Sequence, residues 1–184
     1  MPLSHAILGF LECQPMSGYD LKKYFNQSVA HFWSSTQSHI YKALETLEKE
    51  GLVESKVIPQ EGKPNRKEYH ITDAGRAELH RWVVTPLPLA ITREAWLIQI
   101  FFSHVSSNEE IVALLQARAK DIRASLEAFH TEVHSSLEEN GEHGGMERMR
   151  QLWQMTADYG AAYYESELAW IETAIERARK LPPL

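Results

Sequence analysis

The fold is decided by residues 34–81, SSTQSHIYKALETLEKEGLVESKVIPQEGKPNRKEYHITDAGRAELHR. Apolar side chains recur in its first part at the three- and four-residue spacing of one helix face, namely Ile40, Leu44 and Leu47. Thr36 and Gly51 are the residue types that cap the beginning and the end of such a helix. The sequence therefore predicts an amphipathic helix over about residues 37–50.

A β-hairpin and a further helix follow in the same stretch. Residues 53–58 and 68–72 are rich in β-branched and aromatic residues, and they flank a basic turn, GKPNRK at 62–67. Thr72 then has the residue type that caps a helix. Helix, strand, turn, strand and helix in this order predict a winged helix-turn-helix, a motif that binds duplex DNA. We call its first helix the reading helix and its hairpin the wing.

The rest of the sequence predicts helices only. Two precede the reading helix, at residues 3–13 and 19–26. After a proline-containing boundary, an apolar helix at 93–104 is followed by a capping box at 107–110. Two long helices then meet at a glycine-rich turn, which predicts an antiparallel hairpin. We therefore expect a mostly α fold with a small β-wing.

Two domains are expected: a winged-helix DNA-binding domain at residues 1–85, and a helical dimerisation and effector domain at 86–184. The last helix, from about residue 146 to 180, is apolar over a wider arc than one neighbouring helix covers. A twofold dimer would present two reading helices to a pseudo-palindromic DNA site. The residues expected to meet a second copy of the chain are Tyr164, Leu168, Ile171 and Ile175.

The charge distribution weakens the objection that an acidic protein does not bind DNA. The chain has 184 residues and a net charge of −6. Residues 1–85 hold ten Lys and Arg against ten Asp and Glu, and the remaining nine and fifteen put all the acidity in the second half. DNA binding needs a local basic patch rather than a basic protein. A helical module whose winged helix binds protein stays as the alternative.

The exposed side of the reading helix supplies candidate DNA contacts. Its N-terminal residues Gln37, Ser38 and His39 are placed for base edges, and Gln37 can pair bidentately with adenine. Tyr41 and Lys42 suit phosphates. Each residue alone could be an ordinary solvated side chain, but their position before a wing favours DNA. The wing adds Lys63, Asn65, Arg66 and Lys67.

Six segments resemble the PadR family of bacterial transcriptional regulators: AILGFL at 6–11, SGYDL at 17–21, IYKAL at 40–44, EKEGLV at 48–53, GKPNRKEY at 62–69 and ITDAGR at 71–76. The resemblance implies a homodimeric winged-helix repressor, less often an activator, whose C-terminal helices form the dimer. Some members of the family are released from DNA by a small molecule such as a phenolic acid.

The resemblance also implies roles for particular residues. It places Tyr19 near the DNA face, and His39 departs from the smaller or amide side chain expected at its position. The DNA contacts that it implies are Tyr41, Lys42, Lys63, Arg66 and Lys67.

Aromatic residues suggest a pocket for a small effector. Trp153 and Tyr163 on the last helix, with His31 and Trp33 before the reading helix, are its candidate lining. Aromatic residues at helical spacing are also typical of a core or of a dimer interface, so both readings stay open.

The sequence gives little support for metal binding, catalysis or membrane insertion. His130 and His134 lie four residues apart, as metal ligands on a helix do, but with nine histidines in the chain we expect chance spacing and no metal. The sequence has no phosphate-binding loop, no dinucleotide fingerprint and no nucleophile beside an evident base, so we expect no enzyme and no cofactor. Without a signal peptide or an apolar run of the ~18 residues that a membrane span needs, we expect a cytoplasmic protein with no membrane partner.

Overall fold

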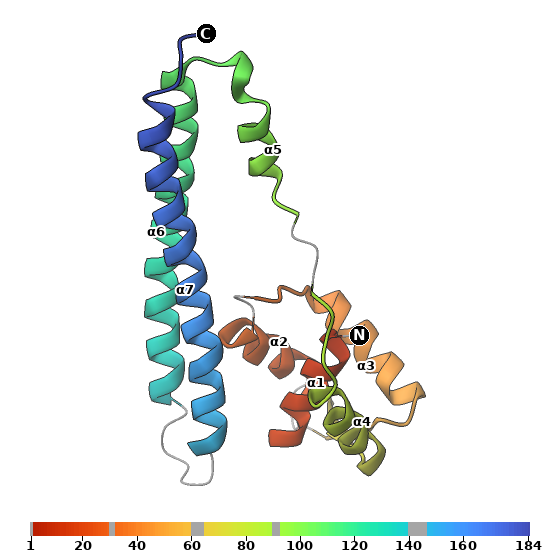
Figure 1. The fold of residues 1–184 in the computed structure, drawn as a ribbon. Helices are drawn as coiled ribbons and strands as arrows, with labels where there is room; N and C mark the ends of the chain where they lie inside the picture. The colour runs from red at the N-terminus through yellow and green to blue at the C-terminus, as the bar shows by residue number, and fades with distance from the viewer. Residues whose placement is uncertain (1, 30–31, 60–64, 90–92, 140–146) are drawn as a thin grey trace. The chain divides into compact units, whose positions relative to one another are not determined.

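The computed structural model describes residues 2–29, 32–59, 65–89, 93–139 and 147–184, without the side chains of Gln27 and of residues 132–139. The chain forms two compact units, residues 1–89 and residues 90–184. We call them the winged-helix unit and the helical unit and describe each by itself (Figure 1). The predicted fold class is confirmed: the chain is mostly helical with one small antiparallel sheet.

The winged-helix unit combines four helices with a three-stranded sheet whose strand order is β1-β3-β2. Both strand pairs are antiparallel. Its elements are α1 (Pro2–Cys13), β1 (Met16–Ser17), α2 (Gly18–Gln27), α3 (Gln37–Lys49), β2 (Val53–Ile58), β3 (Arg66–Ile71) and α4 (Asp73–Val83).

The caps of the reading helix and of the helix after the wing are confirmed. The Thr36 side chain accepts a hydrogen bond from the backbone N–H of His39 at the start of α3. Gly51 follows the same helix with φ of 70°, a left-handed conformation that favours glycine. Thr72 accepts from the N–H of Gly75 at the start of α4.

Two features of the sheet differ from the sequence-based expectation. β1 was expected to be only a break between helices, but Met16 pairs with Tyr69 and Ser17 with Glu68. The wing was expected to turn at residues 62–67, yet β3 begins at Arg66, which pairs with Ile58. Such cross-strand pairs satisfy backbone hydrogen bonds that a turn would leave to water, so the strand starts two residues earlier than its side-chain pattern suggests.

One core fills the winged-helix unit, with contributions from α1, α2, α3 and the sheet. Its buried residues are Ile7, Leu8, Leu11, Met16, Leu21, Phe25, Ile40, Leu44, Leu47, Val53, Tyr69 and Ile71. The three apolar positions that predicted the reading helix are all among them, so the opposite side of α3 faces solvent.

The helical unit is built on the long antiparallel helices α6 (Asn108–Glu139) and α7 (Glu147–Ala178), which run side by side (Figure 1). The capping box at the start of α6 is confirmed, because Ser107 and Glu110 each accept a hydrogen bond from the other's backbone N–H. The turn expected between the two helices lies outside the described residues. Along the seam between α6 and α7 the buried residues are Ile111, Leu115, Ala119, Ile122, Ile171, Ile175 and Ala178.

The helix before this hairpin is shorter than the 93–104 that was expected. It consists of α5 (Ala95–Phe101) and a single 3₁₀ turn, Ser103–Val105. Trp96 and Ile100 pack against the hairpin core, but no residue of α5 is buried. Its remaining apolar side chains stay in solvent: Leu97, Ile98, Phe101 and Phe102 are 42%, 61%, 79% and 57% exposed.

The residues expected at the dimer interface all contact the core of a single chain. Ile171 and Ile175 are buried against α6, and Tyr164 and Leu168 pack on the same cluster. The prediction treated one apolar line of α7 as surplus, whereas α6 already covers that line. A different set of α7 side chains is exposed, Leu152, Met155, Tyr159 and Trp170.

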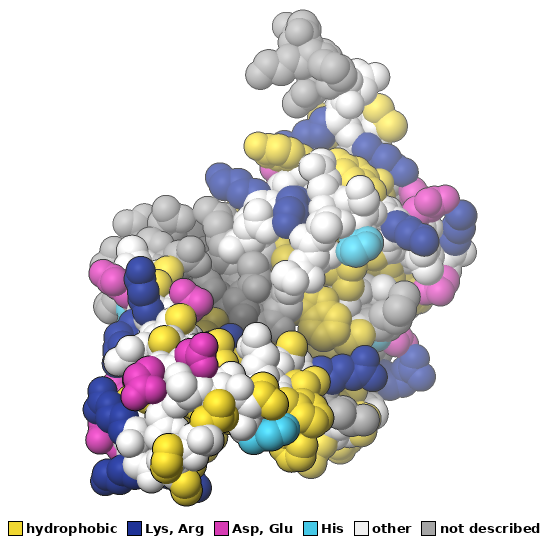
Figure 2. Space-filling view, turned by 90° about the horizontal axis from the view of Figure 1, so that it is seen from above, with side chains coloured by type: hydrophobic (Ala, Val, Ile, Leu, Met, Phe, Trp, Pro, Cys, Tyr) yellow, Lys and Arg dark blue, Asp and Glu magenta, His cyan; other side chains and the backbone are white. Residues whose placement is uncertain are grey.

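Apolar side chains reach the surface in patches between charged ones of both signs, as the space-filling view shows (Figure 2). None of the helices in the described ranges is long and apolar enough to cross a membrane.

Candidate nucleic-acid interface

The N-terminal turn of α3 presents the side chains expected to read bases. Gln37, Ser38 and His39 are all exposed there, and the buried Ile40 behind them sets the direction in which they point. Free backbone N–H groups and the positive end of the helix dipole also favour a phosphate at this end of α3. The geometry suits a helix that enters a DNA groove by its first turn.

Tyr41 is held against the start of α2. A Cβ atom added to Gly18 would lie 2.6 Å from Cε1 and 2.7 Å from Cζ of the Tyr41 ring. Only glycine leaves room for this close approach. The Tyr41 side chain is nevertheless 43% exposed, so its position is fixed while part of the ring stays available to a partner. Tyr19, next to Gly18, is 68% exposed.

The lysines near α3 differ in how they are bound. Lys42 is exposed on α3 and forms no ion pair with the residues that the structure describes. Lys22 on α2 donates to the carbonyl oxygen of Ser35 at 2.7 Å, which ties α2 to the segment before α3. Lys23 is exposed on α2 and was not among the expected contacts, although two adjacent lysines before the reading helix were a visible signal.

The two described cations of the predicted basic turn, Arg66 and Lys67, are each paired with a carboxylate of a helix. Arg66 Nη2 lies 2.7 Å from Asp20 Oδ2 on α2, and Lys67 Nζ lies 2.9 Å from Glu48 Oε2 on α3. Lys67 also lies over the ring of Tyr69 on the same strand, 4.9 Å from the ring centroid. The sequence suggested that both cations are free to bind a phosphate, but in the structure each of them is ion-paired with a carboxylate. Lys63 lies outside the described residues, and Asn65 is exposed.

Both carboxylates are held in their charged form. Partial burial acts to raise the pKa of Asp20, but hydrogen bonds from Ser17 and the charge of Arg66 outweigh it, so the pKa of Asp20 is lowered. The pKa of Glu48 is lowered by hydrogen bonds from Ser55 and Lys67. The pKa of Lys67 is raised, chiefly by its hydrogen bond to Glu48.

The residues expected around an effector belong to both units, His31 and Trp33 to the winged-helix unit and Trp153 and Tyr163 to the helical unit. Trp33 is 44% exposed in the winged-helix unit, and His31 lies outside the described residues. In the helical unit Trp153 is half-buried, and Tyr163 packs edge-on against Tyr164 with ring centroids 5.8 Å apart. The pKa of Tyr163 is raised, first by burial and then by the nearby carboxylates of Glu94 and Glu167. The effector pocket therefore stays a prediction.

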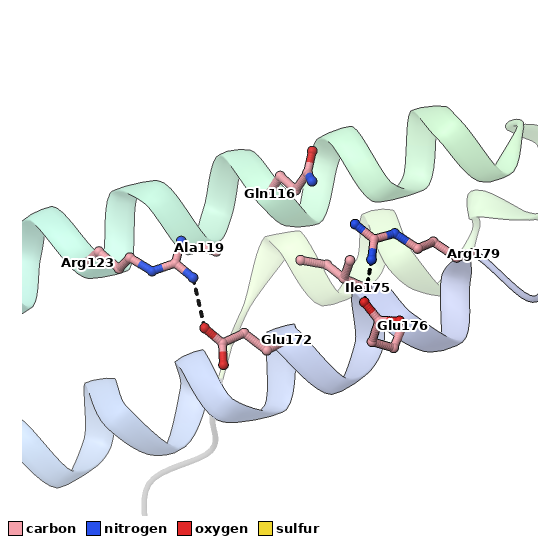
Figure 3. Close-up of a pocket in the computed structure, with 7 residues that line it drawn as sticks. All are labelled: Gln116, Ala119, Arg123, Glu172, Ile175, Glu176 and Arg179. Atoms are coloured by element: carbon pink, nitrogen blue, oxygen red, sulfur yellow. Dashed lines mark hydrogen bonds and ion pairs between the residues drawn. The ribbon is translucent and has the colours of Figure 1, made fainter.

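Two hollows among the described residues of the helical unit are lined by other residues than those four. A pocket of about 210 Å³ lies at the seam of α6 and α7, where Arg123 and Glu172 form an ion pair across the two helices (Figure 3). Arg179 pairs with Glu176 at its other end. A groove of about 510 Å³ lies beside Phe101, Ile111 and Trp170.

The structure does not test the predicted absence of a metal at His130 and His134. His130 is exposed and packs edge-on against Phe129, whereas the side chain of His134 lies outside the described set. Within the described residues, no three His, Cys, Asp or Glu side chains are grouped so that they could hold a metal ion.

Two family models match the chain, one on each unit. The Transcriptional regulator PadR-like family matches residues 7–81, and the Virulence activator alpha C-term family matches residues 92–179. A probable transcriptional regulator of Mycobacterium tuberculosis is 44% identical over 87 residues, which are 47% of this chain and 46% of that protein, so less than half of its length is matched. The Negative transcriptional regulator PadR of Bacillus subtilis is 33% identical over 133 residues, 68% of this chain and 73% of that protein.

Solved structures of Bacillus subtilis PadR share the fold over nearly the whole chain. The complex with operator DNA has a TM-score of 0.81 at 25% identity and covers 97% of this chain and 99% of that one. The complex with p-coumaric acid has a TM-score of 0.80 at 24% identity, covering 97% and 96%. With its reading helix, its wing and a PadR relative matched over two thirds of its length, this chain belongs to the PadR-like family of transcriptional regulators.

Proposed function

We propose that this chain represses transcription by binding, as a homodimer, to a pseudo-palindromic operator in duplex DNA. The observation that carries the proposal is the exposed first turn of α3 beside a wing, within the segment that matches the PadR-like family. Bacillus subtilis PadR is named a negative regulator and has been solved with operator DNA, which supports the same role here. No residue is assigned a catalytic role, and the cytoplasm is the compartment in which such a regulator meets DNA.

Base readout is assigned to the first turn of α3. Gln37 can donate to and accept from adenine in the major groove, and Ser38 and His39 lie beside it. Tyr41 and Lys42, one turn further along, reach phosphates and fix the register of the helix on the duplex. The winged-helix unit has no net charge, so affinity depends on these local contacts and on using two copies at once.

We assign the contact with a second copy of the chain to exposed apolar side chains of the helical unit. Phe101 and Ile98 on α5, and Met155 and Tyr159 on α7, are each more than 60% exposed, so both helices leave apolar side chains at the surface of a single chain. A twofold dimer formed there would carry two copies of α3 to half-sites about 34 Å apart.

A small aromatic acid is the proposed releasing ligand. Bacillus subtilis PadR has been solved with p-coumaric acid, and Trp33, His31, Trp153 and Tyr163 are our candidates for the corresponding pocket in this chain. A ligand that binds better to a dimer with altered spacing of the two α3 helices would lower DNA affinity by shifting the population toward that form.

A mobility shift on the region upstream of the chain's own gene tests the proposal. Gln37→Ala should weaken specific binding by about 1–3 kcal/mol while leaving binding to a random duplex unchanged, since a base contact is lost. Thr46→Ala is the matched control, being exposed on the same helix two turns away. Equal loss on both duplexes would contradict base readout by Gln37.

A protein partner is the second candidate, and the ion-paired wing favours it. Because Arg66 and Lys67 are neutralised by Asp20 and Glu48, the described wing offers little free positive charge. Salt separates the two candidates, since DNA affinity falls steeply between 50 and 200 mM salt when several phosphates are contacted. Wild-type binding to DNA that ignores salt, or no binding at all, would favour the protein partner.

A further inference from the structure

The outer end of the wing extends past the rest of its sheet. β1 pairs only with Tyr69 and Glu68 of β3, so the next residues toward the wing tip, Lys67 and Arg66, have β2 on one side and no strand on the other. Val57 and Ile58, their partners on β2, are 63% and 39% exposed. Among the described residues, no third strand pairs with this part of the hairpin, and its β2 side chains stay partly exposed.

Two ion pairs form at Arg66 and Lys67, the residues of β3 toward the wing tip that β1 does not reach. Successive residues of a strand point to opposite faces of the sheet, so Arg66 and Lys67 leave β3 in opposite directions. Arg66 meets Asp20 on α2 at 2.7 Å, and Lys67 meets Glu48 on α3 at 2.9 Å. The hairpin is thus held from both faces, by one carboxylate from each of the two helices of the helix-turn-helix.

Each carboxylate is itself fixed by a second contact. Asp20 Oδ2 also accepts from Ser17 Oγ at 2.7 Å and from the Ser17 backbone N–H at 3.2 Å, in the capping box of α2. Glu48 accepts from the hydroxyl of Ser55 on β2 as well as from Lys67, so it binds both strands of the wing. Each pair is therefore a charge-assisted hydrogen bond whose carboxylate is oriented by a second contact.

The same capping box adjoins the reading helix. Gly18, the residue after Ser17, is the one on which the Tyr41 ring of α3 rests. A continuous series of contacts thus runs from Arg66 through Asp20 and the start of α2 to the exposed face of α3. The orientation of the wing is coupled to that of the helix that would read bases.

We propose that the pairs Asp20–Arg66 and Glu48–Lys67 form a clamp that sets the wing at a fixed angle to α3, and that Arg66 and Lys67 position the wing and do not bind phosphates. The inference rests on the proposed DNA-binding function. For either cation to take a phosphate, it would have to leave its carboxylate and expose a negative charge to the DNA. Fixing the wing before binding instead removes an ordering cost from complex formation.

The clamp and direct phosphate contact at Arg66 predict changes of opposite sign in DNA affinity when Asp20 is substituted. Asp20→Asn keeps an oxygen for the Ser17 cap but removes the nearer of the two carboxylates at Arg66, the other being Glu68 at 4.0 Å. If the clamp operates, Asp20→Asn and Arg66→Gln each weaken binding to the upstream duplex up to about fivefold, and the double variant is no weaker. The salt slope of the affinity stays at its wild-type value.

Direct contact gives the reverse result, which would overturn the proposal. Asp20→Asn would then tighten binding, because it frees a cation and removes a repelling charge. Arg66→Gln would reduce the magnitude of the salt slope by about 0.9 for each protomer, the value for one lost phosphate contact.

A charge exchange tests the second pair. Lys67→Glu weakens binding, and adding Glu48→Lys restores the pair with its charges exchanged and brings affinity back to within about twofold of wild type. The matched control combines Lys67→Glu with Glu45→Lys, which gives the same net charge one turn earlier on α3 without a partner for residue 67. Recovery in the control that equals recovery in the exchange would overturn positioning by Lys67.

A separate measurement tests the clamp if the proposed DNA-binding function is wrong. If the wild-type chain binds neither the upstream duplex nor a random one, DNA binding is wrong, and amide hydrogen exchange then decides the clamp. Exchange at residues 55–58 and 66–69 should be faster in Asp20→Asn and in Glu48→Gln than in wild type, while residues 40–47 keep their rates. Wild-type rates across the wing in both variants would overturn the clamp.

Discussion

The two units of this chain differ in how completely they bury their own apolar residues. In the winged-helix unit, helices α1 to α3 and the sheet close around one core, and α4 is fitted closely against the sheet through Gly75. In the described part of the helical unit the hydrophobic cluster lies along the seam between α6 and α7, and α5 contributes no buried residue. The first unit therefore has the larger closed core, whereas in the second the side chains of α5 stay at the surface of a single chain.

The difference suggests a division of labour between the two units. Rigid placement of the reading helix and wing needs close packing and paired charges, as around Tyr41 and Arg66. Association with a second copy needs apolar surface that the single chain leaves open, as at Phe101 and Tyr159. The substitutions below test this contrast, beginning with the largest expected effect.

Gly75→Ala should destabilise the winged-helix unit by about 3 kcal/mol or more, because overpacking here cannot be relieved by a side chain alone. The new Cβ would lie 2.1 Å from the carbonyl oxygen of Leu52, so α4 or the backbone after α3 must move. Denaturant unfolding of the full chain, followed by hydrogen exchange over residues 40–47, measures the loss.

Gly9→Ala is the matched control for that prediction. Nothing lies within 4 Å of a Cβ at Gly9, in the middle of α1, so the same change there should stabilise the unit by about 0.5–1 kcal/mol. If the two variants have equal stability, close packing of α4 against the sheet does not contribute to the stability of the winged-helix unit.

Ile171→Ala should cost the helical unit about 3 kcal/mol, the usual range for emptying a buried aliphatic site. Ile171 is fully buried between α6 and α7 of one chain, whereas Tyr159 on the same helix is 72% exposed. Tyr159→Ala should therefore leave the unfolding free energy of the isolated protomer within about 0.5 kcal/mol of wild type. Loss of the dimer without loss of protomer stability in Ile171→Ala would return Ile171 to the interface first predicted from the sequence.

The winged-helix unit could be predicted from its sequence because its signals are local. Thr36, Gly51 and Thr72 mark helix ends through hydrogen bonds and backbone angles that depend on a few neighbouring residues. The strand β1 was missed because Met16 and Ser17 become a strand only by pairing with residues more than fifty positions away.

What the sequence could not predict was which partner each side chain takes. The wing cations Arg66 and Lys67 suggested phosphate contacts by their type and spacing, but Asp20 and Glu48 come to them from distant helices. On α7, the pattern predicted a wide apolar arc, but it did not show that Ile171 and Ile175 pack against α6 of the same chain. Periodicity shows that a face is buried, and only the folded chain shows against what.

Phe101→Asp should shift the chain from dimer to monomer with little change in protomer stability. The side chain is 79% exposed on α5, so a charge there costs the single chain little, but in a buried interface it would remove about 2 kcal/mol or roughly 30-fold in the dimer dissociation constant. Sedimentation equilibrium measures the shift. Ser125→Asp adds the same charge at an exposed site on α6 and should leave the dimer intact. Dimers of equal affinity in both variants would show that α5 does not form the interface.

The smallest expected effect is a pH dependence that differs between the units. In the winged-helix unit the pKa values of Asp20 and Glu48 are lowered from their ordinary values of 3.8 and 4.5, so their contribution is present above about pH 4.5 and is lost as the pH falls through the lowered values. In the helical unit the pKa of Tyr163 is raised above 10.0, so its contribution is present below that pH and is lost as the pH rises through the raised value.

Hydrogen exchange over residues 53–58 between pH 3 and pH 7, corrected for intrinsic rates, should show the wing weakening in acid. Denaturant unfolding above pH 10 should show the helical unit weakening in alkali. For the Asp20–Arg66 pair, whose side chains are partly exposed, the acid effect should not exceed about 1 kcal/mol. Asp20→Asn should remove part of the acid dependence of the wing and none of the alkaline dependence of the helical unit. An acid loss in that variant equal to the wild-type loss would mean that the Asp20–Arg66 pair adds no stability to the winged-helix unit.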